Sequence, residues 1–141
     1  MSQALDFTVA SYNIHKAVGT DGRRDPARTA AVIAEIGADI LALQEADLRF
    51  GKRAGLLDLE TLRRDMGLIA VPTESVGDAH GFHGNLLLVR NGLVEVVHHL
   101  HLPGFEPRGA LMTDLQIAGH PLRVISAHLG LLPPSRTRQI R

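Results

Sequence analysis

The sequence contains no cysteine and no tryptophan, and it has one tyrosine and four phenylalanines among 141 residues. The absence of cysteine excludes disulfide bonds and cysteine-bound zinc, and it is typical of a reducing compartment. The scarcity of aromatic side chains leaves little surface on which nucleobases could stack. The 15 basic residues balance the 15 acidic ones, whereas proteins that coat nucleic acid non-specifically carry a basic excess. Any phosphate binding must therefore be confined to a local site.

Two further absences narrow the class of protein. No apolar run is long enough to cross a bilayer, and the N-terminus lacks the basic and apolar regions of a signal peptide, so we expect a cytoplasmic location. No Gly-x-Gly-x-x-Gly or Gly-Lys-Ser/Thr loop is present, which makes a generic nucleotide-binding domain the weaker alternative. The length and the 45% hydrophobic content suit one domain over residues 1–141.

A β-α-β unit is predicted over the first third of the chain. Residues 7–14 alternate as a strand, and Asp25-Pro26 is a helix-start signal because Asp25 can cap and Pro26 suits the first helical position. Gly37 ends this helix. The run from Asp39 to Glu45 is a buried strand, which we expect to pair in parallel with the first.

The rest of the sequence predicts a second helix over residues 56–66 and a short strand over 68–71. It also predicts two antiparallel strand pairs, over residues 85–100 and 110–129. Asn91-Gly92 between apolar runs indicates a hairpin, and a second turn is expected at residues 118–121. Ser135 resembles the cap of a short terminal helix in which Ile140 is the only large apolar residue. No terminator follows that helix.

Polar side chains end both strands of the β-α-β unit. Asn13 and Glu45 each lie at the carboxyl end of a strand, the edge at which ligand sites gather in such sheets. An amide beside a carboxylate can hold hydrated Mg²⁺ or a phosphate oxygen. The alternative is that Asn13 starts a turn and Glu45 is solvated.

Three later features are also open to two interpretations. His128, late in a strand, could donate to a phosphate or act as an acid or base, or could be a satisfied core histidine. Arg108 before a strand could clamp phosphate or be solvated, and Asn85 could belong to a turn. His98, His99 and His101 do not predict zinc, because adjacent residues of a strand face opposite ways and no carboxylate completes the set.

The order of these elements resembles the endonuclease/exonuclease/phosphatase superfamily, the deoxyribonuclease-like metal phosphoesterases. The resemblance spans residues 8–139 and lies in Ser11-Tyr-Asn-Ile-His15, Asp39-Ile-Leu-Ala-Leu-Gln-Glu45, Gly84-Asn-Leu-Leu-Leu-Val-Arg90, Arg108-Gly-Ala-Leu111, Ser126-Ala-His-Leu-Gly130 and Arg136/Arg138 with Gln139. It implies an α+β fold, the four-layer α-β-β-α sandwich, with about the first half present as a mixed sheet plus two or three helices.

The resemblance also implies roles for five residues. Glu45 would bind the divalent metal, Mg²⁺ or Mn²⁺, with Asn13 beside it. His128 would contact the scissile phosphate, and Asn85 and Arg108 would support the phosphate site. The implied reaction is hydrolysis of a phosphate ester by water, with nucleic acid, a phospholipid head group or a small molecule as the substrate.

Family members also carry a Gly-Asp-x-Asn element and a late Asp-His pair, and neither follows His128 here. We therefore expect residues 1–141 to be the N-terminal part of a single domain, incomplete for catalysis. An apolar sheet face would be exposed and would be covered by a C-terminal half or by self-association. The alternative is a non-catalytic remnant or interaction module that retains the fold.

Overall fold

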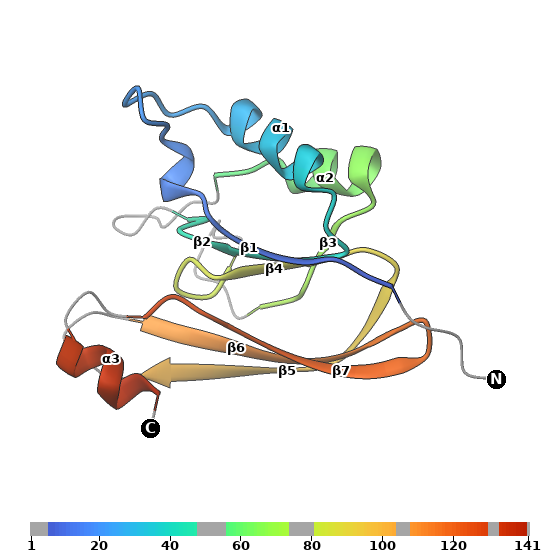
Figure 1. The fold of residues 1–141 in the computed structure, drawn as a ribbon, viewed down its shortest axis with the longest axis vertical. Coiled ribbons are helices and arrows are strands. Elements are labelled where there is room, and N and C mark those ends of the chain that lie inside the picture. Colours follow the sequence, from blue (N-terminus) through green and yellow to red (C-terminus); the bar gives the residue numbers. More distant parts are fainter. Residues whose placement is uncertain (1–5, 48–55, 74–80, 104–107, 130–132, 141) are drawn as a thin grey trace.

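The computed structural model describes residues 6–47, 56–73, 81–103, 108–129 and 133–140. Two helices cover one face of a first sheet, and a second sheet packs against its other face (Figure 1). This gives three successive layers of the sandwich implied by the sequence: helices, sheet and sheet.

The first sheet is mixed and contains the β-α-β unit. Its order is β1-β2-β4-β3, with β1 at Val9–Asn13, β2 at Ile40–Gln44, β3 at Ile69–Ala70 and β4 at Leu86–Val89. Strand β2 runs parallel to β1 and antiparallel to β4. The predicted parallel pairing of the first two strands is therefore confirmed.

Helix α1 (Pro26–Ile36) has the predicted ends. The Asp25 side chain accepts a hydrogen bond from the backbone N–H of Arg28, and Gly37 has a left-handed backbone. Helix α2 (Leu59–Met66) is shorter than predicted, because Asp58 caps it by accepting from the Thr61 backbone N–H. A short 3-10 turn, η1 (His15–Ala17), follows β1.

The second sheet is antiparallel, in the order β5-β6-β7, with β5 at Gly92–Leu102, β6 at Arg108–Ile117 and β7 at His120–Ala127. Ala118 and Gly119 both have positive φ angles, 51° and 79°, as a two-residue type I′ turn between β6 and β7 requires. The second predicted hairpin is thus confirmed, although its turn is tighter than residues 118–121.

The predicted hairpin at Asn91-Gly92 is wrong. Strand β4 pairs with β2 and β3, whereas β5 pairs with β6 in the other sheet. Asn91 does turn the chain, with φ 57°, but the turn passes the chain from one sheet to the other. Both edges of β4 are already hydrogen-bonded, so β5 has no place beside it.

Two apolar layers flank the first sheet. Ala10, Tyr12 and Ile14 pack toward the helices with Leu41, Leu43 and Leu86, while Ile40, Leu87 and Val89 pack toward the second sheet with Leu115 and Ile117. Because side chains alternate along a strand, Asn13 and Asn85 fall on the face that meets the second sheet. The predicted alternation of residues 7–14 is therefore confirmed, since Ala10, Tyr12 and Ile14 pack on the helices while Phe7 packs toward the second sheet.

Helix α3 (Pro133–Gln139) lies at the end of the second sheet where β6 begins (Figure 1). The prediction that Ser135 caps this helix is wrong, since Ser135 lies inside the helix and is buried. The helix starts at Pro133 because proline needs no backbone donor in the first turn. Ile140 is exposed.

The outer face of the second sheet has apolar side chains that are open to solvent beside the Asp114–Arg123 ion pair. Pairing in register places Leu93, Val96, Leu100 and Ile125 on the face opposite the buried Leu111. These four side chains are 63%, 45%, 41% and 63% exposed. The expected exposure of an apolar sheet face is therefore present.

Candidate functional site at the carboxyl edge of the first sheet

Asn13 and Glu45 lie at the same edge of the first sheet. Asn13 pairs with Gln44 in the parallel register, and the Ile14 backbone N–H donates to the Gln44 carbonyl oxygen at 3.1 Å. The Asn13 Oδ1 atom accepts from the His15 backbone N–H at 3.0 Å, which fixes the amide at the start of η1. The turn expected at Asn13 is therefore present, and the amide oxygen retains a second lone pair for a ligand.

Glu45 differs from an ordinary strand residue in its backbone and its surroundings. Its φ angle is 56°, in the left-handed region that is uncommon for residues other than glycine, so the alternation of β2 stops there. The side chain is half-buried, and within the described part of the chain its carboxylate has no hydrogen-bond or ion-pair partner. A partly desolvated carboxylate without a partner is a suitable ligand for a cation.

A tight turn holds the backbone of Glu45 in place. Phe82 and Asn85 exchange two backbone hydrogen bonds of 2.9 Å around His83 and Gly84, whose φ angles are 50° and 79°. A side chain on Gly84 would meet the Glu45 Cα at 3.4 Å. The Ala46 backbone N–H donates to the Gly84 carbonyl oxygen at 3.0 Å, so the turn is locked against the end of β2.

Asn85 joins the two sheets at this edge. It is fully buried, and its Nδ2 atom donates to the Gly109 carbonyl oxygen in β6 at 2.8 Å. This bond leaves the Oδ1 atom as an acceptor, and that atom is buried without a partner among the described residues. A buried acceptor of this kind costs about 1–3 kcal/mol, which a bound donor or cation would offset.

Arg108, the neighbour of Gly109 in β6, contacts His128 at the edge of the second sheet. Arg108 is buried, with 8% of its surface exposed, and its Nη1 atom lies 2.9 Å from His128 Nδ1. His128 follows the last residue of β7 rather than lying inside that strand as predicted. The contact joins the beginning of β6 to the end of β7.

These contacts form a chain along one edge of the molecule: Glu45 packs on Gly84, Asn85 bonds to Gly109, and Arg108 beside it contacts His128. The five residues predicted for the site therefore lie at or next to strand ends along one edge: Asn13, Glu45 and His128 where strands end, and Asn85 and Arg108 where strands begin. Their roles in binding a metal or phosphate stay predictions.

Sequence reasoning missed two hydrogen-bonded supports of this edge. The buried Asp47 carboxylate accepts from the Gly81 backbone N–H at 2.9 Å and so anchors the turn. The Ser11 hydroxyl and the Gln44 amide are hydrogen-bonded between β1 and β2. A carboxylate two residues after Glu45 and the dipeptide His83-Gly84 were the available signals, but both also fit a solvated loop.

Histidines surround the Phe82 ring beside the turn. The ring centroids of His83, His99 and His101 lie 4.7, 5.0 and 5.1 Å from that of Phe82. His98 faces the other way, since it pairs with Met112 while His99 pairs with Leu111. In the described residues no group of three His, Cys, Asp or Glu side chains is arranged to hold a metal ion.

The oxygen donors at the edge fit a hard cation in chemical type. The Glu45 carboxylate, the Asn13 amide oxygen and the buried Asn85 amide oxygen are ligands that Mg²⁺ and Mn²⁺ accept. The buried Oδ1 atom of Asn85 has no hydrogen-bond partner among the described residues, so it could accept a hydrogen bond from a ligand or bind a cation.

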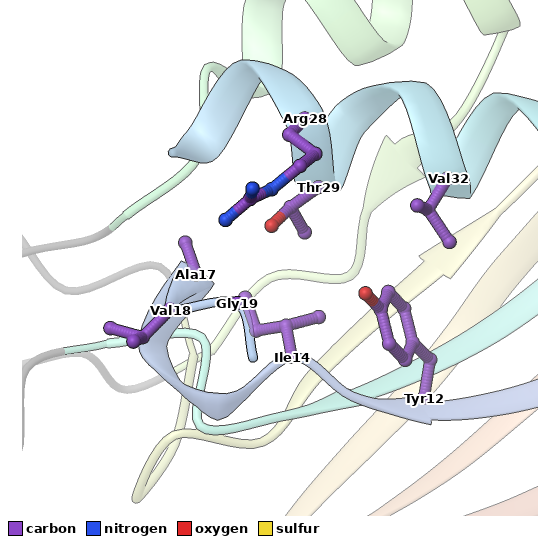
Figure 2. Close-up of a pocket in the computed structure, with 8 residues that line it drawn as sticks. All are labelled: Tyr12, Ile14, Ala17, Val18, Gly19, Arg28, Thr29 and Val32. Carbon is purple, nitrogen blue, oxygen red and sulfur yellow. The ribbon is translucent and has the colours of Figure 1, made fainter. Parts of the chain in front are cut away.

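A small cavity of about 110 Å³ lies elsewhere, between α1, η1 and the helix-facing side of β1 (Figure 2). Tyr12 and Ile14 form its floor, and the Arg28 guanidinium reaches over it from α1. Arg28 is paired with Asp21, and this hydrogen bond lowers the pKa of the Asp21 carboxyl to about 2. Asn13 faces the opposite side of β1, so this cavity is separate from the candidate site.

No helix in the described parts of the chain is both long and apolar enough to span a bilayer. A comparison with curated proteins gives no match. The family model for the endonuclease/exonuclease/phosphatase family matches residues 10–139.

Solved structures with the same fold include two kinds of protein. An endonuclease/exonuclease/phosphatase from Beutenbergia cavernae has a TM-score of 0.70 and 22% identity, covering 96% of this chain and 42% of that one. TDP2 from D. rerio, complexed with a single-strand DNA product, has a TM-score of 0.70 and 18% identity, over 96% of this chain and 52% of that one. TDP2 from Caenorhabditis elegans has a TM-score of 0.68 and 19% identity, over 94% and 38%.

The present chain thus spans about half the length of the solved structures that it matches, and their likeness confirms the fold. The family-model match covers nearly all of the sequence. The protein belongs to the endonuclease/exonuclease/phosphatase family.

Proposed function

We propose that this chain carries the metal-binding and phosphate-binding part of a divalent-metal-dependent phosphoesterase. The observation that supports this most is Glu45: a half-buried carboxylate without a described partner, held in a left-handed backbone against Gly84. A left-handed non-glycine residue costs free energy, and such strain at the end of a buried strand is typical of a functional position.

Each residue of the edge has a proposed task. Glu45, with the amide oxygen of Asn13 beside it, would hold Mg²⁺ or Mn²⁺, and Asn85 would support the phosphate site. A cation bound there offsets the charge that develops on the phosphoryl and leaving oxygens. His128 would donate a hydrogen bond to a phosphoryl oxygen, and Arg108 would support it. In the reaction a water oxygen would bond to phosphorus while the bond to the leaving oxygen breaks, and the proton lost by the water would pass through solvent to the leaving oxygen.

The proposed substrate class is a phosphate ester, either nucleic acid, a phospholipid head group or a small molecule. The single-strand DNA product in the D. rerio TDP2 structure favours nucleic acid among these. The balanced charge and the few aromatic residues of this chain favour a local contact over a long binding track. A cytoplasmic location stays a prediction.

The test is hydrolysis of generic phosphate monoesters and diesters with Mg²⁺ or with EDTA. We expect turnover that needs the metal and that Glu45→Gln lowers by about 100-fold or more, because the amide keeps the shape but loses the charge. Glu35→Gln is the matched control, since Glu35 is an exposed carboxylate on α1. Metal-dependent turnover that survives Glu45→Gln would remove Glu45 from its proposed role.

The exposed outer face of the second sheet favours a second candidate, a non-catalytic interaction module. Its exposed Leu93, Val96, Leu100 and Ile125 would be covered by further polypeptide. We propose a C-terminal portion or a second copy of the chain as that cover. A folded protein that binds partners through this face and shows no metal-dependent hydrolysis would favour this candidate over the enzyme.

A further inference from the structure

The contact between Arg108 and His128 fixes where the histidine carries its hydrogen. A guanidinium has only donors, because all of its nitrogens carry N–H groups or share the delocalised charge. The Arg108 Nη1 atom, 2.9 Å from His128 Nδ1, must therefore donate. Nδ1 must accept with its lone pair, so the hydrogen of a neutral imidazole is on Nε2.

The same contact disfavours the doubly protonated ring. An imidazolium would place a second N–H against the donor and a second positive charge beside a guanidinium that is only 8% exposed. Like charges at this separation in a buried setting repel strongly. The contact therefore stabilises the neutral ring relative to the cation.

The position of Arg108 in β6 agrees with a supporting task. The Gly109 carbonyl oxygen accepts a hydrogen bond from the Asn85 side chain. Arg108 is the preceding residue of β6, and its side chain therefore points to the other face of the strand. Arg108 alternates along β6 with the residues that pack on the first sheet, among them Leu115 and Ile117. Its guanidinium contacts His128 at the end of the neighbouring strand β7.

We propose that Arg108 is a positioning residue that holds His128 as the neutral Nε2–H tautomer. In this form Nε2 carries the only N–H group of the ring, and the lone pair of Nδ1 is occupied by Arg108. His128 then acts on a phosphoryl oxygen as a neutral hydrogen-bond donor, and it does not take the proton of the attacking water. This assignment rests on the proposed function for its chemical meaning, whereas the tautomer itself is a property of the protein alone.

The experiment is a long-range ¹H–¹⁵N spectrum of the imidazoles in the uniformly labelled protein. It is recorded near pH 8, above the usual histidine pKa of about 6.5, and the His128→Gln variant identifies the His128 signals. We expect the Nε2–H tautomer in the wild type, a mixture of tautomers in Arg108→Met, and recovery in Arg108→Lys because an ammonium also donates. Arg123→Met, which removes an exposed arginine of β7 paired with Asp114, is the control and leaves the pattern unchanged.

The inference is overturned by an Nδ1–H tautomer or an imidazolium in the wild type, or by an unchanged pattern in folded Arg108→Met. If Arg108→Met does not fold, the wild-type spectrum decides. The proposed function fails on a different result, namely the absence of metal-dependent hydrolysis, so the two failures can be told apart. A non-hydrolysing protein with the Nε2–H tautomer would retain this inference, and a hydrolase with the other tautomer would refute it.

Discussion

Substitution of Gly109 by alanine tests whether the turn at Phe82–Asn85 is locked against β6. A Cβ atom at position 109 would lie 2.6 Å from Phe82 Cε1 and 2.7 Å from His83 Cδ2. Phe82 cannot swing away easily, because it is 6% exposed and is ringed by three imidazoles. The turn must therefore shift away from β6.

The expected loss has two parts. Overpacking of a filled interior costs about 1–3 kcal/mol, and a lengthened hydrogen bond between Asn85 and Gly109 would add about 1 kcal/mol. An unfolding entropy of about 2.1 cal/mol/K per residue gives about 0.3 kcal/mol/K for 141 residues. A loss of about 2–4 kcal/mol therefore lowers Tm by about 7–13 °C.

Thermal and urea unfolding of Gly109→Ala, Phe82→Leu and the double variant measure this effect. Leucine lacks the ring atom that the new Cβ would meet, so the double variant should be less destabilised than the sum of the two single variants. Wild-type stability of Gly109→Ala, or strict additivity in the cycle, would show that the close approach of the turn to β6 does not constrain the protein.

Three further predictions concern other parts of the structure. Gly84→Ala should lower Tm and weaken Mn²⁺ binding in a titration, because φ +79° strains a residue that has a side chain, and relief of this strain would shift the turn that is hydrogen-bonded to Ala46 beside Glu45; unchanged binding would contradict the proposed packing. Asp58→Ala should lower Tm at neutral pH through loss of the α2 cap. Hydrogen bonds from Thr61 lower the pKa of the Asp58 carboxyl, so its stabilisation is present above the unfolded pKa of about 3.9 and is lost as pH falls through the folded value; a difference in Tm that persists at lower pH would be inconsistent. Leu100→Lys with Ile125→Lys should reduce self-association in analytical ultracentrifugation if copies meet at the outer face, and unchanged sedimentation would exclude that contact.

Local signals predicted the β-α-β unit well. Asp25, Pro26 and Gly37 act on the helix that they flank, and their effect depends little on the rest of the chain. The apolar run of β2 placed Glu45 at a strand end beside Asn13, since parallel register is nearly forced in such a unit. The edge of the sheet was therefore readable from sequence.

Non-local packing decided the features that sequence reasoning missed. Asn91-Gly92 signals a turn, yet which strand pairs with β4 depends on β2 and β3, distant in sequence. The Glu45 backbone angle is held by Gly84, and the Arg108–His128 contact joins two strand ends across the β6–β7 hairpin. No spacing rule encodes these contacts, because each joins residues that are distant in sequence and that meet only after the strands of a sheet have paired.

The most direct test of the central claim is a Mn²⁺ titration followed by electron paramagnetic resonance, with Mg²⁺ as competitor. The proposal predicts a site that Mg²⁺ displaces and that Glu45→Gln weakens by roughly tenfold or more, while Glu35→Gln binds like the wild type. Equal Mn²⁺ affinity in Glu45→Gln and the wild type would contradict the assignment of Glu45 as the metal ligand.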